Sequence, residues 1–196
     1  MWQATPEEPT PDVSFVPPLL CRKLSLLEKA TLKVVRDAGG SQGLPVVFAS
    51  RHGEWRQTFR LLRELCTEGT VSPAGFSLAV HNAAPGVLSL VEHNVAPYTA
   101  VAADDATLEA GLLEALMTPA GALLVYAEEA VPEFYQADYP TSLITQALAL
   151  KIRPGKTCCW QTGKGTAALT PAAVLAFAQG RQATLKGRCL TLTQSG

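Results

Sequence analysis

Short apolar runs alternate along this chain with stretches in which apolar residues recur at helical spacing. The runs at residues 44–49, 98–103 and 122–127 are rich in Val, Ala and Leu, which is typical of strands buried on both faces of a parallel sheet. Apolar residues recurring every three or four positions predict helices between these runs. The predicted helices span residues 20–38, 54–65, 77–93, 106–117 and 171–179, and two further strands are predicted at residues 143–152 and 189–193.

Residues that favour helix ends support several of these boundaries. Gly39 and Gly40 follow the first predicted helix, where glycines commonly end a helix. Ser77 is placed as the cap of the helix at 77–93. Pro85 lies inside that helix and predicts a kink or an interruption, because proline cannot donate the helical hydrogen bond.

Strands that alternate with helices predict an α/β fold with a mainly parallel central sheet flanked by helices. Three segments follow from the pattern. Residues 1–19 contain several prolines and read as an extended N-terminal arm, and residues 20–152 form the α/β part. Residues 153–196 are predicted to be a C-terminal extension packed on the same domain, with a Gly- and Lys-rich loop at 153–165.

Composition limits the classes of partner. Of the 196 residues, 47% are apolar and 17% are charged, and the net charge is −1. So little charge favours an apolar surface reserved for a subunit interface, with a large core as the alternative. We find no basic cluster, which argues against nucleic acid. The chain also lacks an apolar run of about eighteen residues and the features of a signal peptide, so we expect a cytoplasmic protein without a membrane span.

Cysteine chemistry is a weak candidate. The number of cysteines is odd and their spacing matches no metal-binding knuckle, so we expect no metal, no cofactor and mostly small buried thiols. A nucleophilic cysteine needs a nearby histidine as its base. A stand-alone cysteine-dependent acyl-transfer enzyme using Cys158, Cys159 or Cys66 with a histidine therefore stays open as an alternative. The cysteines are Cys21, Cys66, Cys158, Cys159 and Cys189, and the histidines are His52, His81 and His93.

Other polar motifs mostly have structural explanations. The stretch Gly163-Lys164-Gly165-Thr166 departs from the phosphate-loop pattern and is rejected. The acidic pairs at residues 104–105 and 128–129 are interpreted as solvated turn residues. His81 and Asn82 are interpreted as polar residues that fix loops or, equally, take part in chemistry, since each sits beside a buried element.

Two stretches resemble β-ketoacyl synthases. Residues 71–73 (Val-Ser-Pro) and 76–86 are similar to a loop and helix of that family, with Asn82 four residues before Gly86. Residues 98–103 (Tyr-Thr-Ala-Val-Ala-Ala) resemble the strand-to-helix elbow, where ketosynthases read Thr-Ala-Cys-Ala. The resemblance covers residues 20–152 in collinear order. It is nearest to short ketosynthase-like proteins of aryl-polyene and fatty-acid-like pathways, which are similar to the chain length factors of type II polyketide systems.

This resemblance implies a truncated thiolase-like fold in which residues 20–152 correspond to the N-terminal half of a ketosynthase. Val101 takes the place of the nucleophilic cysteine, and a valine side chain cannot form a thioester. The second half, which carries the histidines or the His and Asn of active enzymes, has no counterpart, because no histidine follows Ile152. The resemblance therefore implies a non-catalytic protein.

The resemblance also implies a partner. Ketosynthase subunits pair by adding the strand before the elbow, here about residues 97–102, to the partner's sheet, which places Tyr98, Thr99 and Ala100 at the interface. We expect a heterodimer with a full-length β-ketoacyl synthase, and an acyl carrier protein reached through that complex. Residues implied near the partner's acyl tunnel, either to limit chain length or merely to pack, are Thr58, Leu61, Leu62 and Phe76. A homodimeric module that binds acyl chains or carrier protein is a further alternative.

Overall fold

The computed structural model describes residues 1–41, 43–139, 144–163 and 165–195, so Leu143 of the predicted strand and Lys164 of the rejected phosphate loop lie outside the described residues. The strands are β1 (Trp2–Gln3), β2 (Val46–Ala49), β3 (Tyr98–Val101), β4 (Ala122–Glu128), β5 (Gln146–Ile152), β6 (Cys158–Thr162), β7 (Thr184–Lys186) and β8 (Leu190–Gln194). The α-helices are α1 (Pro18–Cys21), α2 (Leu26–Asp37), α3 (Trp55–Glu68), α4 (Pro73–Ser77), α5 (Ala83–Glu92), α6 (Thr107–Met117) and α7 (Pro171–Ala178). Two 3₁₀ turns, η1 (Asp104–Ala106) and η2 (Glu133–Tyr135), complete the elements.

The main sheet has the strand order β1-β5-β4-β2-β3. β2 runs parallel to β3 and to β4, whereas β5 is antiparallel to β4 and β1 is antiparallel to β5. The α/β prediction is confirmed, and the parallel part consists of three strands. A parallel neighbour needs a crossover that is usually an α-helix, and the described residues between β4 and β5 form the short turn η2 but no α-helix, which accords with the antiparallel direction of β5.

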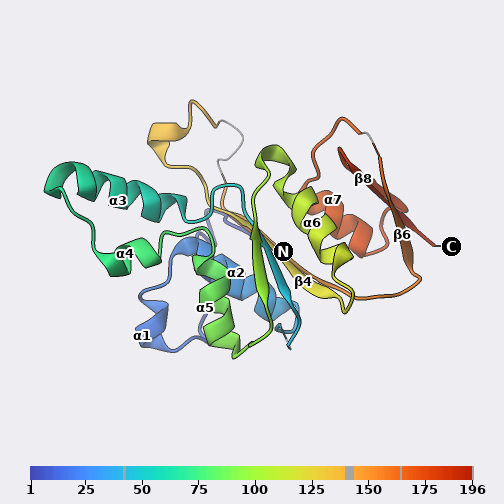
Figure 1. Ribbon diagram of the computed structural model, residues 1–196, viewed down its shortest axis with the longest axis horizontal. Coiled ribbons are helices and arrows are strands. Elements are labelled where there is room, and N and C mark those ends of the chain that lie inside the picture. The colour runs from blue at the N-terminus through green and yellow to red at the C-terminus, as the bar shows by residue number, and fades with distance from the viewer. Residues whose placement is uncertain (42, 140–143, 164, 196) are drawn as a thin grey trace.

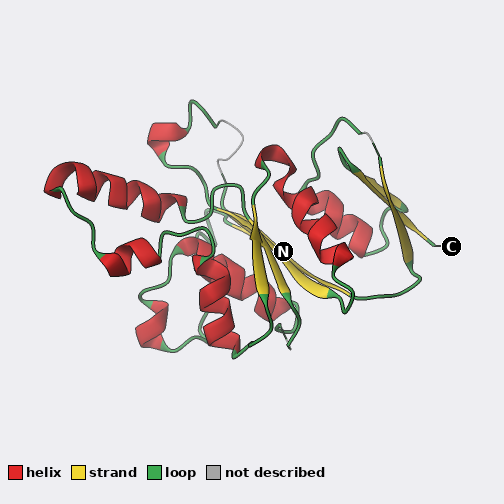
Figure 2. Ribbon diagram, in the orientation of Figure 1, coloured by secondary structure: helices red, strands yellow, loops and turns green. Residues whose placement is uncertain are grey.

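Both faces of the sheet are covered (Figure 2). Val46 and Phe48 of β2 point to one face and join a core with Leu27 of α2 and Leu88 of α5. Val47 and Ala49 point to the other face, where they pack with α6 and the C-terminal segment. Burial on both faces explains why β2 and β4 read as continuous apolar runs in the sequence. The expectation that residues 98–103 form a strand buried on both faces is wrong, because β3 lies at the edge of the sheet with Tyr98 and Thr99 exposed.

Two predicted helices are each divided in two. The helix predicted at 20–38 is α1 followed by α2, because Ser25 caps α2: its hydroxyl accepts from the Glu28 N–H at 2.9 Å. The helix predicted at 77–93 is α4 followed by α5. Ser77 is the last residue of α4 and not a cap, and Ser72 caps α4 instead. Pro85 lies in the first turn of α5, where its missing N–H has no helical partner to lose.

The chain ends are more structured than the sequence predicts. In the arm, Trp2 and Gln3 pair with Ala147 and Gln146 of β5, and Trp2 is buried. The predicted loop at 153–165 contains β6, which pairs with β8 in a second, antiparallel sheet of order β6-β8-β7. This small sheet and α7 lie at the opposite end of the molecule from α3 and α4 (Figure 1).

The expectation of buried thiols is wrong. Cys66, Cys159 and Cys189 are exposed, and Cys21 and Cys158 are half-buried. In the part of the chain that the structure describes, no group of three His, Cys, Asp or Glu side chains could hold a metal ion. Among the same residues, no helix has the length and apolar character needed to cross a membrane.

Candidate functional site

The elbow between β3 and α6 is the position that the sequence singles out. Val101 is the last residue of β3, and Asp104 follows with a φ of 50°, in the left-handed region that aspartate tolerates better than most residues. The Thr107 hydroxyl accepts from the Ala103 N–H at 2.9 Å and donates to the Asp104 carbonyl at 2.7 Å. These bonds fix the sharp turn, and the half-buried side chain at its start is an aliphatic one.

Charged residues fill the space beside the elbow. The Arg51 guanidinium, just after β2, contacts the carboxylate of Asp104 and lies 2.8 Å from the Asp105 carboxylate. The guanidinium of Arg188, in the turn between β7 and β8, lies 3.7 Å from the other carboxylate oxygen of Asp105. The carboxyl ends of parallel strands are where open α/β sheets bind ligands. Here that edge is bridged by ion pairs, next to a cavity of about 640 Å³ that Arg51, Asp104 and Asp105 help to line.

The acidic pair that ends β4 is buried, so its interpretation as solvated residues is wrong. Glu128 accepts hydrogen bonds from the Arg51 N–H and from the Ser50 hydroxyl. Burial is the main cause that raises the pKa of Glu128 to about 7, against the opposing effect of those bonds. Glu129 is 3% exposed and accepts from the Arg56 N–H at 3.4 Å. Asp104 and Asp105 are exposed, as predicted.

A second buried carboxyl group lies at the start of α3. Glu54 is 1% exposed and accepts a hydrogen bond from the Ser25 hydroxyl at 2.9 Å. Burial first, and the nearby Glu28 carboxylate second, raise the pKa of Glu54 to about 8. Glu54 is therefore largely protonated at neutral pH. Sequence reasoning missed this residue, because nothing local distinguishes it from an ordinary acidic residue at a helix start.

The two histidines near the sheet hold loops in place. His81 lies in the connection between α4 and α5, and its Nε2 is 2.7 Å from the Ser50 carbonyl at the end of β2. Asn82 is exposed and occupies the cap position of α5 without a side-chain cap bond. His52 packs against Trp55 with ring centroids 3.8 Å apart. Burial, followed by the Arg51 charge, lowers the pKa of His52 to about 4, so its imidazole is neutral at pH 7.

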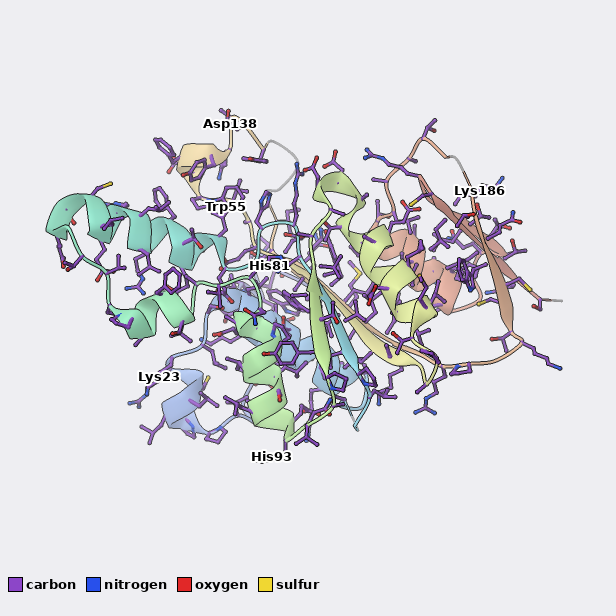
Figure 3. All side chains as sticks on the ribbon, in the orientation of Figure 1. Lys23, Trp55, His81, His93, Asp138 and Lys186 are labelled. Carbon is purple, nitrogen blue, oxygen red and sulfur yellow. The ribbon has the colours of Figure 1, made fainter. Side chains whose placement is uncertain are left out.

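An aromatic cavity lies along α3. It has a volume of about 430 Å³ and places Thr58 and Leu62 on the same wall of α3, one turn apart. Trp55 and Tyr135 meet edge to face with centroids 5.3 Å apart, which joins α3 to η2. The lining residues are His52, Trp55, Thr58, Phe59, Leu62, Tyr135, Asp138 and Tyr139. Figure 3 shows Trp55 and Asp138 on this side of the molecule.

The other tunnel candidates lie elsewhere. Leu61 is buried and does not line this cavity; its Cδ2 lies 3.1 Å from where a Cβ on Gly75 of α4 would be. Phe76 of α4 is 59% exposed. The sequence-predicted set is therefore divided between the cavity wall, the contact of α3 with α4, and the open surface.

Strand β3 forms one edge of the main sheet. Tyr98 and Thr99 are exposed, and Ala100 and Val101 are half-buried. The N–H of Val46 donates to the Pro97 carbonyl and the N–H of Ser50 to that of Val101, so these carbonyls face β2. Successive residues of a strand point their N–H and C=O groups to opposite sides. The N–H and C=O groups of Tyr98 and Ala100 therefore point away from β2, towards the open edge of the sheet.

A parallel-centred sheet with a sharp strand-to-helix elbow defines an α/β domain of the thiolase-like type, matching the N-terminal part of a ketosynthase. The family model for the β-ketoacyl synthase N-terminal domain matches residues 1–193, and the chain belongs to this family. The match reaches beyond the 20–152 of the sequence resemblance and includes the arm and the C-terminal sheet.

A solved structure supports the same relationship. A chain in the complex of the ketosynthase ApeO with its chain length factor ApeC, from Xenorhabdus doucetiae, is similar to this protein, with a TM-score of 0.72 and 26% sequence identity. The similarity covers 92% of this chain and 82% of the matched chain, which is thus only slightly longer. A search of curated proteins finds no match.

Proposed function

We propose that this protein is a non-catalytic subunit, similar to a chain length factor, that pairs with an active β-ketoacyl synthase and shapes its acyl tunnel. The single observation that carries the proposal is Val101 at the end of β3. By the sequence resemblance, Val101 takes the place of the family's nucleophilic cysteine, and a valine side chain cannot form a thioester. The ion pairs of Arg51 with Asp104 and Asp105 lie beside this turn. The fold is retained while the chemistry of the elbow is lost.

The open edge of β3 supports pairing. Among the described residues, no strand lies beside the outward backbone groups of Tyr98 and Ala100, and such an edge is a template for another strand. Large apolar side chains at this edge are also exposed: Tyr98 is 40% exposed, and Val95 in the turn before β3 is fully exposed. Burying apolar side chains and an open strand together favours a stable interface.

The cavity on α3 supports a role in chain length. Thr58 and Leu62 share a wall with aromatic rings, which suits an apolar or conjugated chain end. In the proposed complex, the tunnel of the synthase ends at this cavity, and the size of the α3 side chains limits the chain. Carrier protein delivers that chain through the synthase subunit.

A thiol enzyme is a weaker alternative. Among the side-chain hydrogen bonds of the described residues, none joins a cysteine thiol to a histidine ring. The His81 ring contacts the Ser50 carbonyl, and the Cys159 thiol contacts the Ser195 hydroxyl. The pKa of the Cys189 thiol is raised, by desolvation and then by its interaction with Glu109, which opposes thiolate formation. These contacts of the described residues therefore give no support to a cysteine–histidine pair.

Co-expression with a full-length β-ketoacyl synthase from the same genome tests the proposal. We expect a complex with one copy of each chain in size-exclusion chromatography with light scattering, and no condensing activity from this chain alone. Separate elution of the two proteins contradicts the proposal. A homodimer that ignores the synthase favours the alternative of an acyl-binding or carrier-binding module.

A further inference from the structure

Charge is distributed very unevenly along this chain. All 17 acidic residues lie at or before Asp138, together with nine of the 16 lysines and arginines. The 58 residues after Asp138 hold the other seven basic residues and no acidic residue. The C-terminal part is therefore positively charged because it lacks acidic residues, and the net charge of −1 conceals this separation.

The small sheet displays much of this charge. Lys186 is exposed on β7, Arg188 is exposed in the turn to β8, and Arg181 is exposed between α7 and β7. At the start of β6, Arg153 and Lys156 are also exposed. Basic side chains thus lie at both ends of a sheet whose longest strands have five residues.

The outer face of this sheet is polar. Residues directly opposite each other share a face, so the pairs Leu185–Leu192 and Trp160–Leu192 belong to the inner face, where Leu185 and Leu192 are buried. The outer face holds the alternate residues Cys159, Gln161, Thr184, Lys186, Thr191 and Thr193. None of these six side chains is acidic, aromatic or a large hydrophobic.

The carboxylates that contact this region come from the body of the protein. Glu109 is buried and accepts from the backbone N–H groups of Arg188, Cys189 and Leu190. Asp105 lies 3.7 Å from Arg188 and forms an ion pair with it. The exposed side chains of Arg181 and Lys186 do not belong to this ion pair.

We infer that the outer face of β6-β8-β7 docks a protein that presents a carboxylate-rich surface. A flat polar face with basic side chains around it gives electrostatic complementarity with little desolvation of apolar groups. Single-stranded nucleic acids commonly stack their bases on aromatic side chains, and interfacial membrane segments commonly bury large apolar side chains. The six outer residues include neither type, which favours a protein as the partner.

The position of this face leaves the β3 edge open to a synthase. The small sheet lies at one end of the molecule and α3 with α4 at the other, with β3 between them (Figure 1). Under the proposed function, the acidic partner is the carrier protein, and the small sheet is a docking site for it outside the synthase subunit. That identification of the partner rests on the proposed function, whereas the basic face does not.

The test measures binding of the apo form of acyl carrier protein to the full chain, alone and in complex with the synthase. The double variant Arg181→Glu with Lys186→Glu is expected to weaken binding about tenfold and to reduce its salt dependence. The matched control, Arg22→Glu with Lys23→Glu, changes net charge equally at exposed positions near α1. Figure 3 shows Lys23 and Lys186 at opposite ends of the molecule. The control is expected to bind as the wild type does.

Several results overturn the inference: equal weakening by both double variants, no weakening by either, or binding of phosphatidylglycerol vesicles or single-stranded DNA in place of carrier protein. The variant with Gln at both positions repeats the test if the Glu variant unfolds. Stoichiometry with the synthase is measured separately. A chain that binds carrier protein through this face without pairing with the synthase refutes the proposed function and retains the docking site.

Discussion

The carboxylate of Glu109 on α6 accepts a hydrogen bond of 2.6 Å from the backbone N–H of Leu190, at the start of β8. The same carboxylate accepts from the two preceding N–H groups and is 1% exposed. One side chain on the main body thus anchors the turn that begins the last strand of the C-terminal sheet.

Replacing Glu109 with Ala is expected to lower the free energy of unfolding by about 3 kcal/mol, because three N–H groups lose a charged acceptor inside the protein. Denaturant unfolding followed by circular dichroism measures the change. Glu114→Ala is the control, since Glu114 lies on the same helix with its side chain exposed. Equal loss of stability in both variants would refute the role of Glu109.

Stability above pH 6.5 is expected to fall as the pH rises, because of Glu54. Its pKa rises on folding from 4.5 to about 8, so the folded state keeps a proton that the unfolded state has lost. The stabilising contribution is complete below about pH 4.5 and is lost as the pH rises from there to about 8, by up to about 1.4 kcal/mol per pH unit. Glu128, with a pKa of about 7, adds to the slope only in the lower part of this window.

The variant Glu54→Gln is expected to flatten that slope, because an amide resembles the protonated carboxyl group and does not titrate. Urea midpoints at pH 6.5, 7 and 8 give the slope, and Glu68→Gln, at an exposed position near the end of α3, serves as the control. A slope that persists unchanged in Glu54→Gln would assign it to other groups.

Pairing through β3 is expected to fail in Ala100→Pro. Proline removes an N–H that points away from β2, so pairing with β2 is preserved while a strand added at the open edge loses a donor. Light scattering with the synthase should show separate chains, while the melting temperature changes little. Glu68→Ala, at the exposed end of α3 and outside the cavity lining, is the control for complex formation. A stable Ala100→Pro heterodimer would exclude strand addition at this edge.

Product length is expected to shorten in Thr58→Trp. The larger side chain occupies the aromatic cavity beside Leu62, so the major product of the complex should lose at least one extension unit. Mass spectrometry of the released chains measures this. Arg60→Trp places the same tryptophan side chain on α3 at an exposed position that does not line the cavity. A product change there as large as in Thr58→Trp would contradict the proposed tunnel.

Sequence patterns predicted the elements that are buried on both sides and missed those defined by distant contacts. Val46–Ala49 is fully buried, and such burial leaves an uninterrupted apolar run that the sequence displays. The strand Cys158–Thr162 is mostly exposed, so it has no such run and was predicted as a loop. Leu78 and Val80 continue a helical spacing through the break between α4 and α5, where His81 instead contacts the Ser50 carbonyl.

The buried acids were missed for a similar reason. Glu128 is held by the N–H of Arg51, 77 positions earlier in the chain, and Glu54 by the hydroxyl of Ser25. The residues close to either acid in the sequence do not indicate that it has a hydrogen-bond partner so far away along the chain. The elbow residue Val101 was singled out by resemblance to a family motif, because only comparison with an active elbow makes an ordinary valine informative.

The separation of acidic and basic residues gives this nearly neutral protein a large electric dipole. A dipole exerts a torque, so an acidic partner arriving by diffusion is turned towards the C-terminal sheet before any side chain touches it. At physiological ionic strength this orientation begins only within about 8 Å, one Debye length. Charge placement of this kind therefore changes how often an encounter is productive more than how long the resulting complex lasts.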